Sequence, residues 1–187
     1  MHILKNLFIV VFLSFLFSIK GEAQTTEQSD FSGLKKCTVF SAGDDNVNSY
    51  RIPSLLTTKD GTLLVFCEAR RDSWRDKSRT DIVVKRSEDT GKTWSVMQDL
   101  TQGITGAYMD PTPILDSITG RIFLFTTFWP SEDHSGTKNR AILITSDDNG
   151  KTWSSPVDVT STIIPAGYHI VGFGPGAGLQ MSGKQFK

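Results

Sequence analysis

The feature that most constrains the fold is an eight-residue segment that occurs twice. The first copy spans residues 87–94 (SEDTGKTW), and the second spans residues 146–153 (SDDNGKTW), 59 positions later. The copies share Ser, Asp, Gly, Lys, Thr and Trp in one register. A repeat at this spacing indicates repeated structural units, and it suits one blade of a β-propeller with a modest insertion.

Each copy has the composition of a turn held by its own side chains. Glycine accepts the positive φ that such a turn needs, the aspartate accepts hydrogen bonds from backbone N–H groups, and the tryptophan packs beneath. We therefore predict that Asp89 and Asp148 are structural rather than catalytic.

Short apolar runs rich in Val, Ile, Phe and Thr, each ended by turn residues, fill most of the chain and predict β-strands. No stretch after the N-terminal segment has a sustained helical period, so we predict an all-β fold. Gly61 and Gly120 lie between paired runs, where each supplies the positive φ of a hairpin turn. The predicted strands lie near residues 37–40, 52–57, 62–67, 81–86, 113–115, 122–128, 141–145 and 179.

Two further motifs precede the repeats, Tyr50-Arg51-Ile52-Pro53 and Glu68-Ala69-Arg70. Together with the repeated segment, the Asp box, they closely resemble the bacterial-type exo-sialidase (neuraminidase) family. The resemblance implies a six-bladed β-propeller, about 24 strands, with the Asp boxes on the face away from the active site. The runs above would fill roughly its first three blades, so we expect residues 34–187 to be the incomplete N-terminal part of the propeller.

The resemblance assigns substrate-binding roles to two arginines. Sialic acid carries a carboxylate, and a guanidinium matches its two oxygens with paired donors. Arg51 corresponds to the first of three family arginines that hold this group, the other two being expected downstream, and Arg70 corresponds to an arginine near the sugar O4. Glu68 lies two residues earlier on the same side of an extended chain and could orient an arginine. A plain surface role for Arg51, and a solvated pair of Glu68 with Arg70 or Arg71, are the alternatives.

Asp76 matches the family's general acid/base aspartate by its position in the loop that follows Arg70. Such a carboxylic acid protonates the departing glycosidic oxygen and, as carboxylate, activates the incoming water. Asp72 and Asp81 are the alternatives if the loop is gapped differently.

Sialidases are an exception among glycosidases because a tyrosine is their nucleophile. Tyr50, Tyr108 and Tyr168 do not match its position, so we expect this tyrosine and its glutamate partner downstream of this chain.

Two more residues have candidate roles by resemblance. Asp110 resembles a family aspartate that binds the sugar's polar substituents, with a turn cap before Pro111 as the alternative. Trp129 could pack against an N-acetyl group or be a plain core or rim residue. His2, His134 and His169 have no metal-ligand spacing, and we expect no metal and no organic cofactor.

Residues 1–23 have the layout of a cleaved secretory signal peptide: Lys5, then an almost uncharged run over 7–19, then small residues. The run is too short to favour a membrane span, although an anchor that stays attached is the alternative. Residues 24–33 are polar and read as a flexible lead-in. We therefore expect a secreted, periplasmic or cell-surface protein.

Overall composition excludes some partners. The chain has 20 basic and 20 acidic residues, so no net field favours nucleic acid or an anionic membrane. Cys37 and Cys67 are the two cysteines; one disulfide and two free thiols are both open.

By resemblance, the expected function is a retaining exo-α-sialidase that releases terminal sialic acid from glycans. Glycoproteins, glycolipids and oligosaccharides are its expected partners, and this chain alone is expected to be inactive. A trans-sialidase and a non-catalytic Asp-box propeller that binds glycans or proteins are the alternatives.

Overall fold

The computed structural model describes residues 36–102, 106–131 and 135–181. The predicted signal peptide (1–23) and lead-in (24–33) lie outside these residues. Within the described part of the chain, no helix has the length and apolar character needed to cross a membrane.

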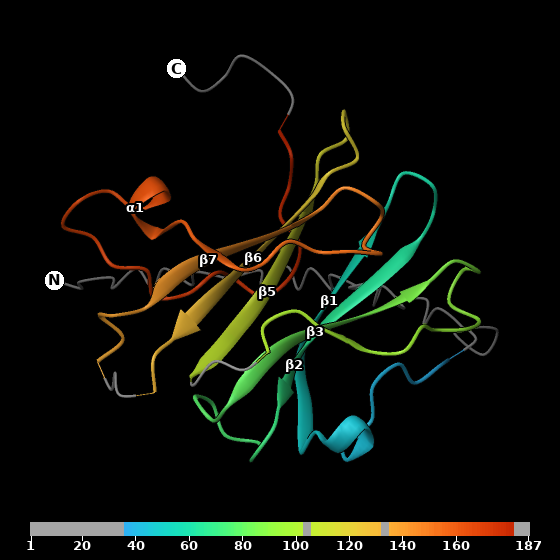
Figure 1. Cartoon of the computed structure of the whole chain (residues 1–187), viewed down its shortest axis with the longest axis horizontal. Helices are drawn as coiled ribbons and strands as arrows, with labels where there is room; N and C mark the ends of the chain where they lie inside the picture. Colours follow the sequence, from blue (N-terminus) through green and yellow to red (C-terminus); the bar gives the residue numbers. More distant parts are fainter. Residues whose placement is uncertain (1–35, 103–105, 132–134, 182–187) are drawn as a thin grey trace, which may run out of the picture. The chain divides into compact units, whose positions relative to one another are not determined.

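In the described part of the chain, eight strands form two consecutive antiparallel units of four. Figure 1 shows the long strands of both units. The first unit contains β1 (Ser49–Thr57), β2 (Leu63–Arg70), β3 (Thr80–Ser87) and β4 (Gln98–Asp99). The second contains β5 (Ala107–Leu115), β6 (Ile122–Trp129), β7 (Arg140–Ser146) and β8 (Val157–Asp158). The units join where Thr80 of β3 pairs in parallel with Ala107 of β5. Helical structure in the described residues is limited to η2 (Asp44–Asn46) and α1 (Thr160–Ile163).

The prediction of an all-β chain is confirmed, and two four-stranded units in succession are what a propeller requires. The sheet that the described residues form is not closed. Gly61 and Gly120 have φ of 86° and 83°, as expected for the two hairpin turns.

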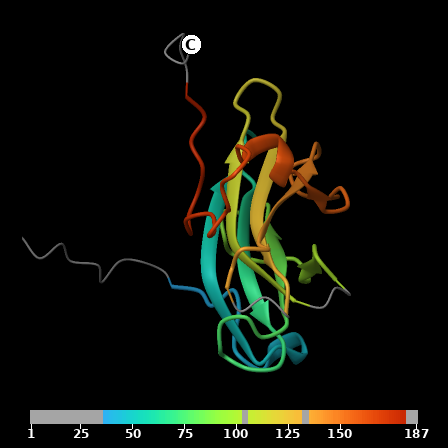
Figure 2. The same ribbon diagram turned by 90° about the vertical axis from the view of Figure 1, so that its left-hand side faces the viewer.

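Two predicted strands are wrong. Residues 37–40 form no strand; Phe40 instead stacks on Tyr50 with ring centroids 4.8 Å apart. The chain near Leu179 also forms none within the described residues. It runs beside β1 and β5 (Figure 2), where the Gly178 N–H donates to the Pro113 carbonyl oxygen at 2.8 Å and Ser54 Oγ donates to the Gly176 carbonyl oxygen at 2.6 Å. Isolated bonds of this kind do not make a ladder, and a proline and glycines interrupt the segment.

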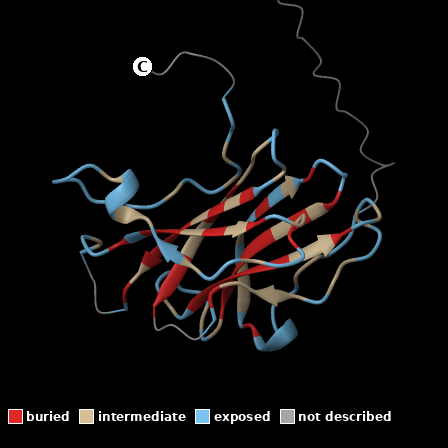
Figure 3. Ribbon diagram, turned by 45° about the horizontal axis from the view of Figure 1, so that its top comes forward, coloured by how far each residue is buried: buried red, intermediate tan, exposed pale blue. Residues whose placement is uncertain are grey.

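Strand alternation produces the main core. In β2, Leu64 and Phe66 point to one side and are fully buried, and Ile82 and Val84 of β3 lie in the same cluster and are also fully buried. Residues of β6 and β7 complete the cluster, so both units share one core, and burial is concentrated on the long strands (Figure 3). Shared burial of apolar surface fixes how the two units pack.

Both Asp boxes form the predicted turns at the ends of β3 and β7. In the first, Asp89 accepts hydrogen bonds from the backbone N–H groups of Lys92 and Thr93 at 3.0 and 2.9 Å. In the second, Asp148 accepts from the Thr152 N–H at 2.9 Å, and Trp153 packs edge-on against Phe66.

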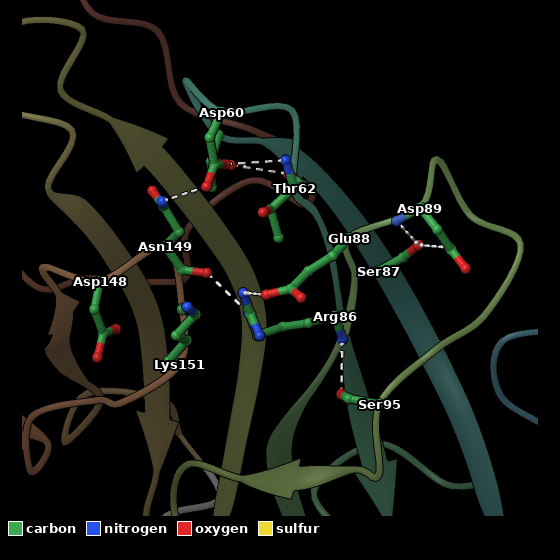
Figure 4. A network of polar contacts seen from close by, with 12 residues as sticks. Asp60, Thr62, Arg86, Ser87, Glu88, Asp89, Ser95, Asp148, Asn149 and Lys151 are labelled. Carbon is green, nitrogen blue, oxygen red and sulfur yellow. Dashed lines mark hydrogen bonds and ion pairs between the residues drawn. The ribbon is translucent and has the colours of Figure 1, made fainter.

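The second box also ties the two units together (Figure 4). Arg86 of β3 donates to the Asn149 carbonyl oxygen at 2.9 Å, and the Asn149 side-chain amide donates to Asp60 at 2.7 Å. The repeated turn therefore serves packing between units, as its structural interpretation requires.

Candidate active site

A cavity of about 330 Å³ opens at the end of the strands opposite to the Asp boxes. The strand register explains this placement, because Arg70 at the end of β2 pairs with Thr80, whereas Ser87 of the first box pairs with Leu63 at the other end of β2. Residues from β1, β2, β5, β6 and the loop between β2 and β3 converge there. They are Arg51, Ile52, Glu68, Arg70, Asp76, Lys77, Met109, Asp110 and Trp129.

A buried ion pair forms the floor. Glu68 Oε2 accepts from Arg70 Nε at 3.0 Å and from Arg70 Nη2 at 2.8 Å, and the two side chains are only 1% and 2% exposed. Glu68 Oε1 accepts from the backbone N–H of Asp110 at 3.1 Å. The solvated-pair alternative for Glu68 is therefore wrong, since alternation of buried β2 places both side chains inside the protein.

Burial raises the pKa of Glu68, and the Asp110 N–H and the Arg70 guanidinium act against that rise. A carboxylate held by one guanidinium and one backbone donor fixes Arg70 in a single orientation. Arg70 also donates to the Trp74 carbonyl oxygen at 2.6 Å, which holds the loop after β2 against the floor.

Asp76 lies at the mouth of the cavity, with its side chain 71% exposed. Its Oδ1 atom is 2.6 Å from Arg70 Nη2 and 3.6 Å from Arg51 Nη1. One carboxylate oxygen thus lies between two guanidinium groups that come from different strands. Arg51, Arg70 and Asp76, which the family resemblance assigned to one site, therefore lie together.

The two alternative acids lie elsewhere. Asp72 forms an exposed ion pair with Arg79 at 3.2 Å, and Asp81 is bound by Arg71 Nε at 2.8 Å. Arg71 also binds Asp99. Both side chains are thus paired with arginines, and neither Asp72 nor Asp81 lines the cavity.

Asp110 and Trp129 line the wall that the second unit contributes. The turn-cap interpretation of Asp110 does not account for its position, because its side chain faces the cavity while its N–H binds Glu68. Burial raises the pKa of Asp110, with Arg70 acting in the opposite direction. Lys77 Nζ lies 3.7 Å above the centroid of the Trp129 ring, a cation–π contact that joins the loop after β2 to the end of β6.

The sequence did not predict the two β-bulges that orient the side chains of this cavity. The first strand of each unit carries a bulge, between Arg51 and Ser54 in β1 and between Met109 and Thr112 in β5. Ile52 and Asp110 occupy it with φ of 52° and 58°. A left-handed β-branched residue is an outlier, and bulges beside a site redirect side chains.

A repeat in the sequence could have revealed these bulges. Tyr50-Arg51-Ile52-Pro53-Ser54 and Tyr108-Met109-Asp110-Pro111-Thr112 share Tyr, Pro and a hydroxyl residue 58 positions apart. Lys77 was missed too, and no pattern in the sequence links it to Trp129.

The described residues that line this cavity include no tyrosine, serine or cysteine, and the described residues contain no metal-ligand cluster. Burial raises the pKa of Tyr50 to about 12, and its hydroxyl donates to the Asp44 carbonyl oxygen at 3.2 Å. Tyr108 is buried in the core against Phe128. His169 is described, whereas His2 and His134 lie outside the described residues.

The cysteines are both free, with Cys37 exposed and Cys67 buried. Burial raises the pKa of Cys67 to about 12, and its thiol donates to the Arg51 carbonyl oxygen at 3.0 Å. This contact supports the bulge that carries Arg51.

A larger depression of about 400 Å³ lies at residues 99–102 and 153–156. Its one titratable residue is Asp99, which Arg71 already binds. The smaller cavity holds six charged side chains, and it is therefore the candidate active site.

An all-β chain of four-stranded units with Asp boxes and an arginine-lined cavity at the opposite strand ends defines a propeller-type protein of the Asp-box class. Residues 52–186 match the family described as the BNR repeat-like domain. The sialidase of Bacteroides fragilis is 32% identical over 163 residues, which are 75% of this chain and 30% of that protein. The chain therefore belongs to the BNR repeat-like family, among the sialidases with Asp-box repeats.

Solved structures agree on the fold. A Hadza microbial sialidase is 32% identical with a TM-score of 0.59, over 64% of this chain and 27% of that one. A leech intramolecular trans-sialidase complexed with 2,7-anhydro-Neu5Ac has a TM-score of 0.68 at 20% identity, over 82% of this chain and 41% of that one. The chain spans about a third of the length of the curated relatives it matches.

Proposed function

We propose that this chain carries the acid/base and first substrate-binding part of an exo-α-sialidase, which removes terminal sialic acid from glycoconjugates. One observation carries the proposal: a carboxylate oxygen of Asp76 lies between Arg51 and Arg70 in a cavity of about 330 Å³. One sugar in this cavity could contact both a guanidinium that binds its carboxylate and a carboxylic acid that donates a proton.

Arg51 is the group that receives the substrate carboxylate. Its side chain is 47% exposed and its contact with Asp76 is long, 3.6 Å, so it is available to a second carboxylate. Arg70 is committed to Glu68 on one edge. It therefore acts as a fixed donor toward the polar substituents of the sugar, beside Asp110.

Asp76 is the general acid/base. As an acid it gives its proton to the glycosidic oxygen while the bond from that oxygen to the anomeric carbon breaks, and the leaving sugar departs as an alcohol. As a base it takes a proton from the water that releases sialic acid from the enzyme. Its exposure at the mouth suits both steps, since the leaving group and the water exchange there.

A retaining reaction also needs a nucleophile. We propose that it is a tyrosine contributed by sequence outside these 187 residues, because Tyr50 and Tyr108 are held away from the cavity. These 187 residues alone then lack covalent catalysis, and we expect them to be inactive by themselves.

Replacement of the acid tests the proposal. In a sialoside-hydrolysing protein that contains this chain, Asp76→Ala should slow hydrolysis of sialyl-lactose by about 10²- to 10⁴-fold, the usual contribution of a general acid. A sialoside with an activated aryl leaving group needs little protonation, so Asp76→Ala should slow its hydrolysis much less. Asp72→Ala is the matched control on the same loop, and equal losses on both substrates would exclude Asp76 as the acid.

Two other functions remain distinguishable. A trans-sialidase would pass the sialyl group to a sugar rather than to water, and a leech intramolecular trans-sialidase is among the proteins with a similar fold. Analysis of the reaction products distinguishes hydrolysis from transfer. A non-catalytic glycan-binding propeller would bind sialosides and release no sialic acid. We also propose export of the protein, on the signal-like residues 1–23, which N-terminal sequencing of the mature protein would test.

A further inference from the structure

Lys77 is a charged residue of the cavity that the proposed reaction does not use. It is exposed, follows Asp76 directly, and has a left-handed backbone with φ of 63°. Its ammonium lies over the Trp129 ring, and within the described residues it forms no ion pair with a carboxylate. The Lys77 ammonium therefore lies at the cavity without a direct carboxylate partner among the described residues.

Burial defines a depth axis for the cavity. Glu68 and Arg70 at the floor are 1% and 2% exposed, whereas Asp76 at the mouth is 71% exposed. An exo-acting enzyme places the terminal sugar toward the floor, and the rest of the glycan leaves through the mouth. Asp76 must touch the glycosidic oxygen. Lys77 follows it in the loop and is exposed at the same cavity, so its side chain is within reach of the sugar beyond the bond that breaks.

The wall that carries Lys77 is distinct from the wall that carries Arg51. Arg51 projects from β1 of the first unit, whereas Lys77 reaches across to Trp129 at the end of β6 in the second. The aromatic face orients the ammonium and limits its side-chain freedom, so that less entropy is lost when it meets an anion.

We propose that Lys77, held by Trp129, is a second anion-binding group that favours glycans whose leaving sugar carries its own negative charge. The inference rests on the proposed function, and it assigns Lys77 to specificity rather than to the chemical step. A carboxylate on a second sialic acid and a sulfate on the next sugar share the required chemistry.

Three substrates and three variants test the assignment. The substrates are sialyl-lactose, whose leaving group is neutral, disialyl-lactose, and sialyl-lactose sulfated on galactose. The ratio of kcat/KM for each anionic substrate to that for sialyl-lactose is measured in a hydrolysing protein that contains this chain. Lys77→Met removes the charge and keeps an unbranched chain over Trp129, Lys77→Arg keeps the charge, and Lys92→Met on the Asp-box side is the matched control.

Lys77→Met should lower the ratio by about 3- to 10-fold, the range for a partly exposed charge pair, whereas Lys77→Arg and Lys92→Met should retain it. A loss with only one anionic substrate identifies the source of the charge. If Lys77→Met changed this ratio by less than about twofold for both anionic substrates, the assignment would be overturned, because loss of a charge pair of this kind should have a larger effect.

Salt provides a measurement that does not depend on a variant folding. Raising the ionic strength should lower the preference of the unmodified protein for anionic leaving groups, and a salt-independent preference would contradict the inference. If no preparation hydrolyses even sialyl-lactose, the proposed function itself fails. Hydrolysis of sialyl-lactose with a ratio insensitive to Lys77 refutes the Lys77 assignment alone.

Discussion

Glu68→Gln is expected to destabilise the protein far more than its conservative shape suggests. Glu68 is 1% exposed, and its two carboxylate oxygens accept three hydrogen bonds, two from Arg70 and one from the Asp110 N–H. A glutamine keeps one oxygen and turns an NH₂ group toward one of these donors. The change removes the charge that compensates a buried guanidinium.

Removing one partner of a buried ion pair usually lowers the free energy of unfolding by roughly 3–5 kcal/mol. Arg70 keeps its contacts with Asp76 and the Trp74 carbonyl oxygen, both at 2.6 Å. We therefore expect the low end, about 3 kcal/mol. For a domain of this size, that is a fall in Tm of about 6–12 °C.

Glu88→Gln is the matched control. Glu88 pairs with Arg86 at 2.9 Å, almost the distance of the Glu68 pair, but its side chain is 63% exposed. An exposed pair contributes about 0.5 kcal/mol, so Tm should fall by about 1–2 °C. Urea and thermal unfolding followed by circular dichroism measure both variants. If Glu68→Gln cost no more than Glu88→Gln, the reasoning about the buried pair would be refuted.

A double-mutant cycle isolates the pair itself. Arg70→Met leaves Glu68 buried without its cation, and should also be strongly destabilising. The double variant should then be more stable than the sum of the single losses predicts, by about 1–3 kcal/mol. Additive losses would mean that the two side chains act independently.

Two further predictions concern the turns and the bulge. Burial acts to raise the pKa of Asp148, but hydrogen bonds from Thr152 and Ser146 lower it to about 2. Because the folded pKa is below the unfolded value of about 4, the stabilisation is present above that pH and is lost as pH falls toward 2. Asp148→Ala should lower the free energy of unfolding by about 1 kcal/mol at pH 7 and by less at pH 2. Urea unfolding at the two pH values measures this loss, and an equal loss at both would refute the prediction. Ile52→Gly should cost less than about 1 kcal/mol because it relieves the φ of 52°, whereas Leu56→Gly, on ordinary strand backbone against the core, should cost several times more.

Much of the fold follows from local chemistry. The Asp boxes hold themselves through side-chain to backbone bonds within eight residues, so their sequence predicts their structure. The same holds for the hairpins at Gly61 and Gly120, whose φ values of 86° and 83° are a local requirement. The predicted strand near Leu179 is wrong because a strand depends on a partner, which its own residues do not report.

The sequence by itself determined the residue types of the site and, through strand alternation, that Glu68 and Arg70 lie on the same side of one strand. Tertiary structure decided what those residues meet. Asp76 contacts arginines from two different strands, and Lys77 reaches a tryptophan 52 positions later in the chain. The bulges at Ile52 and Asp110 also depend on register against neighbouring strands. Turn chemistry is encoded within a few residues, whereas contacts between distant segments exist only once the shared core has fixed how the two units pack.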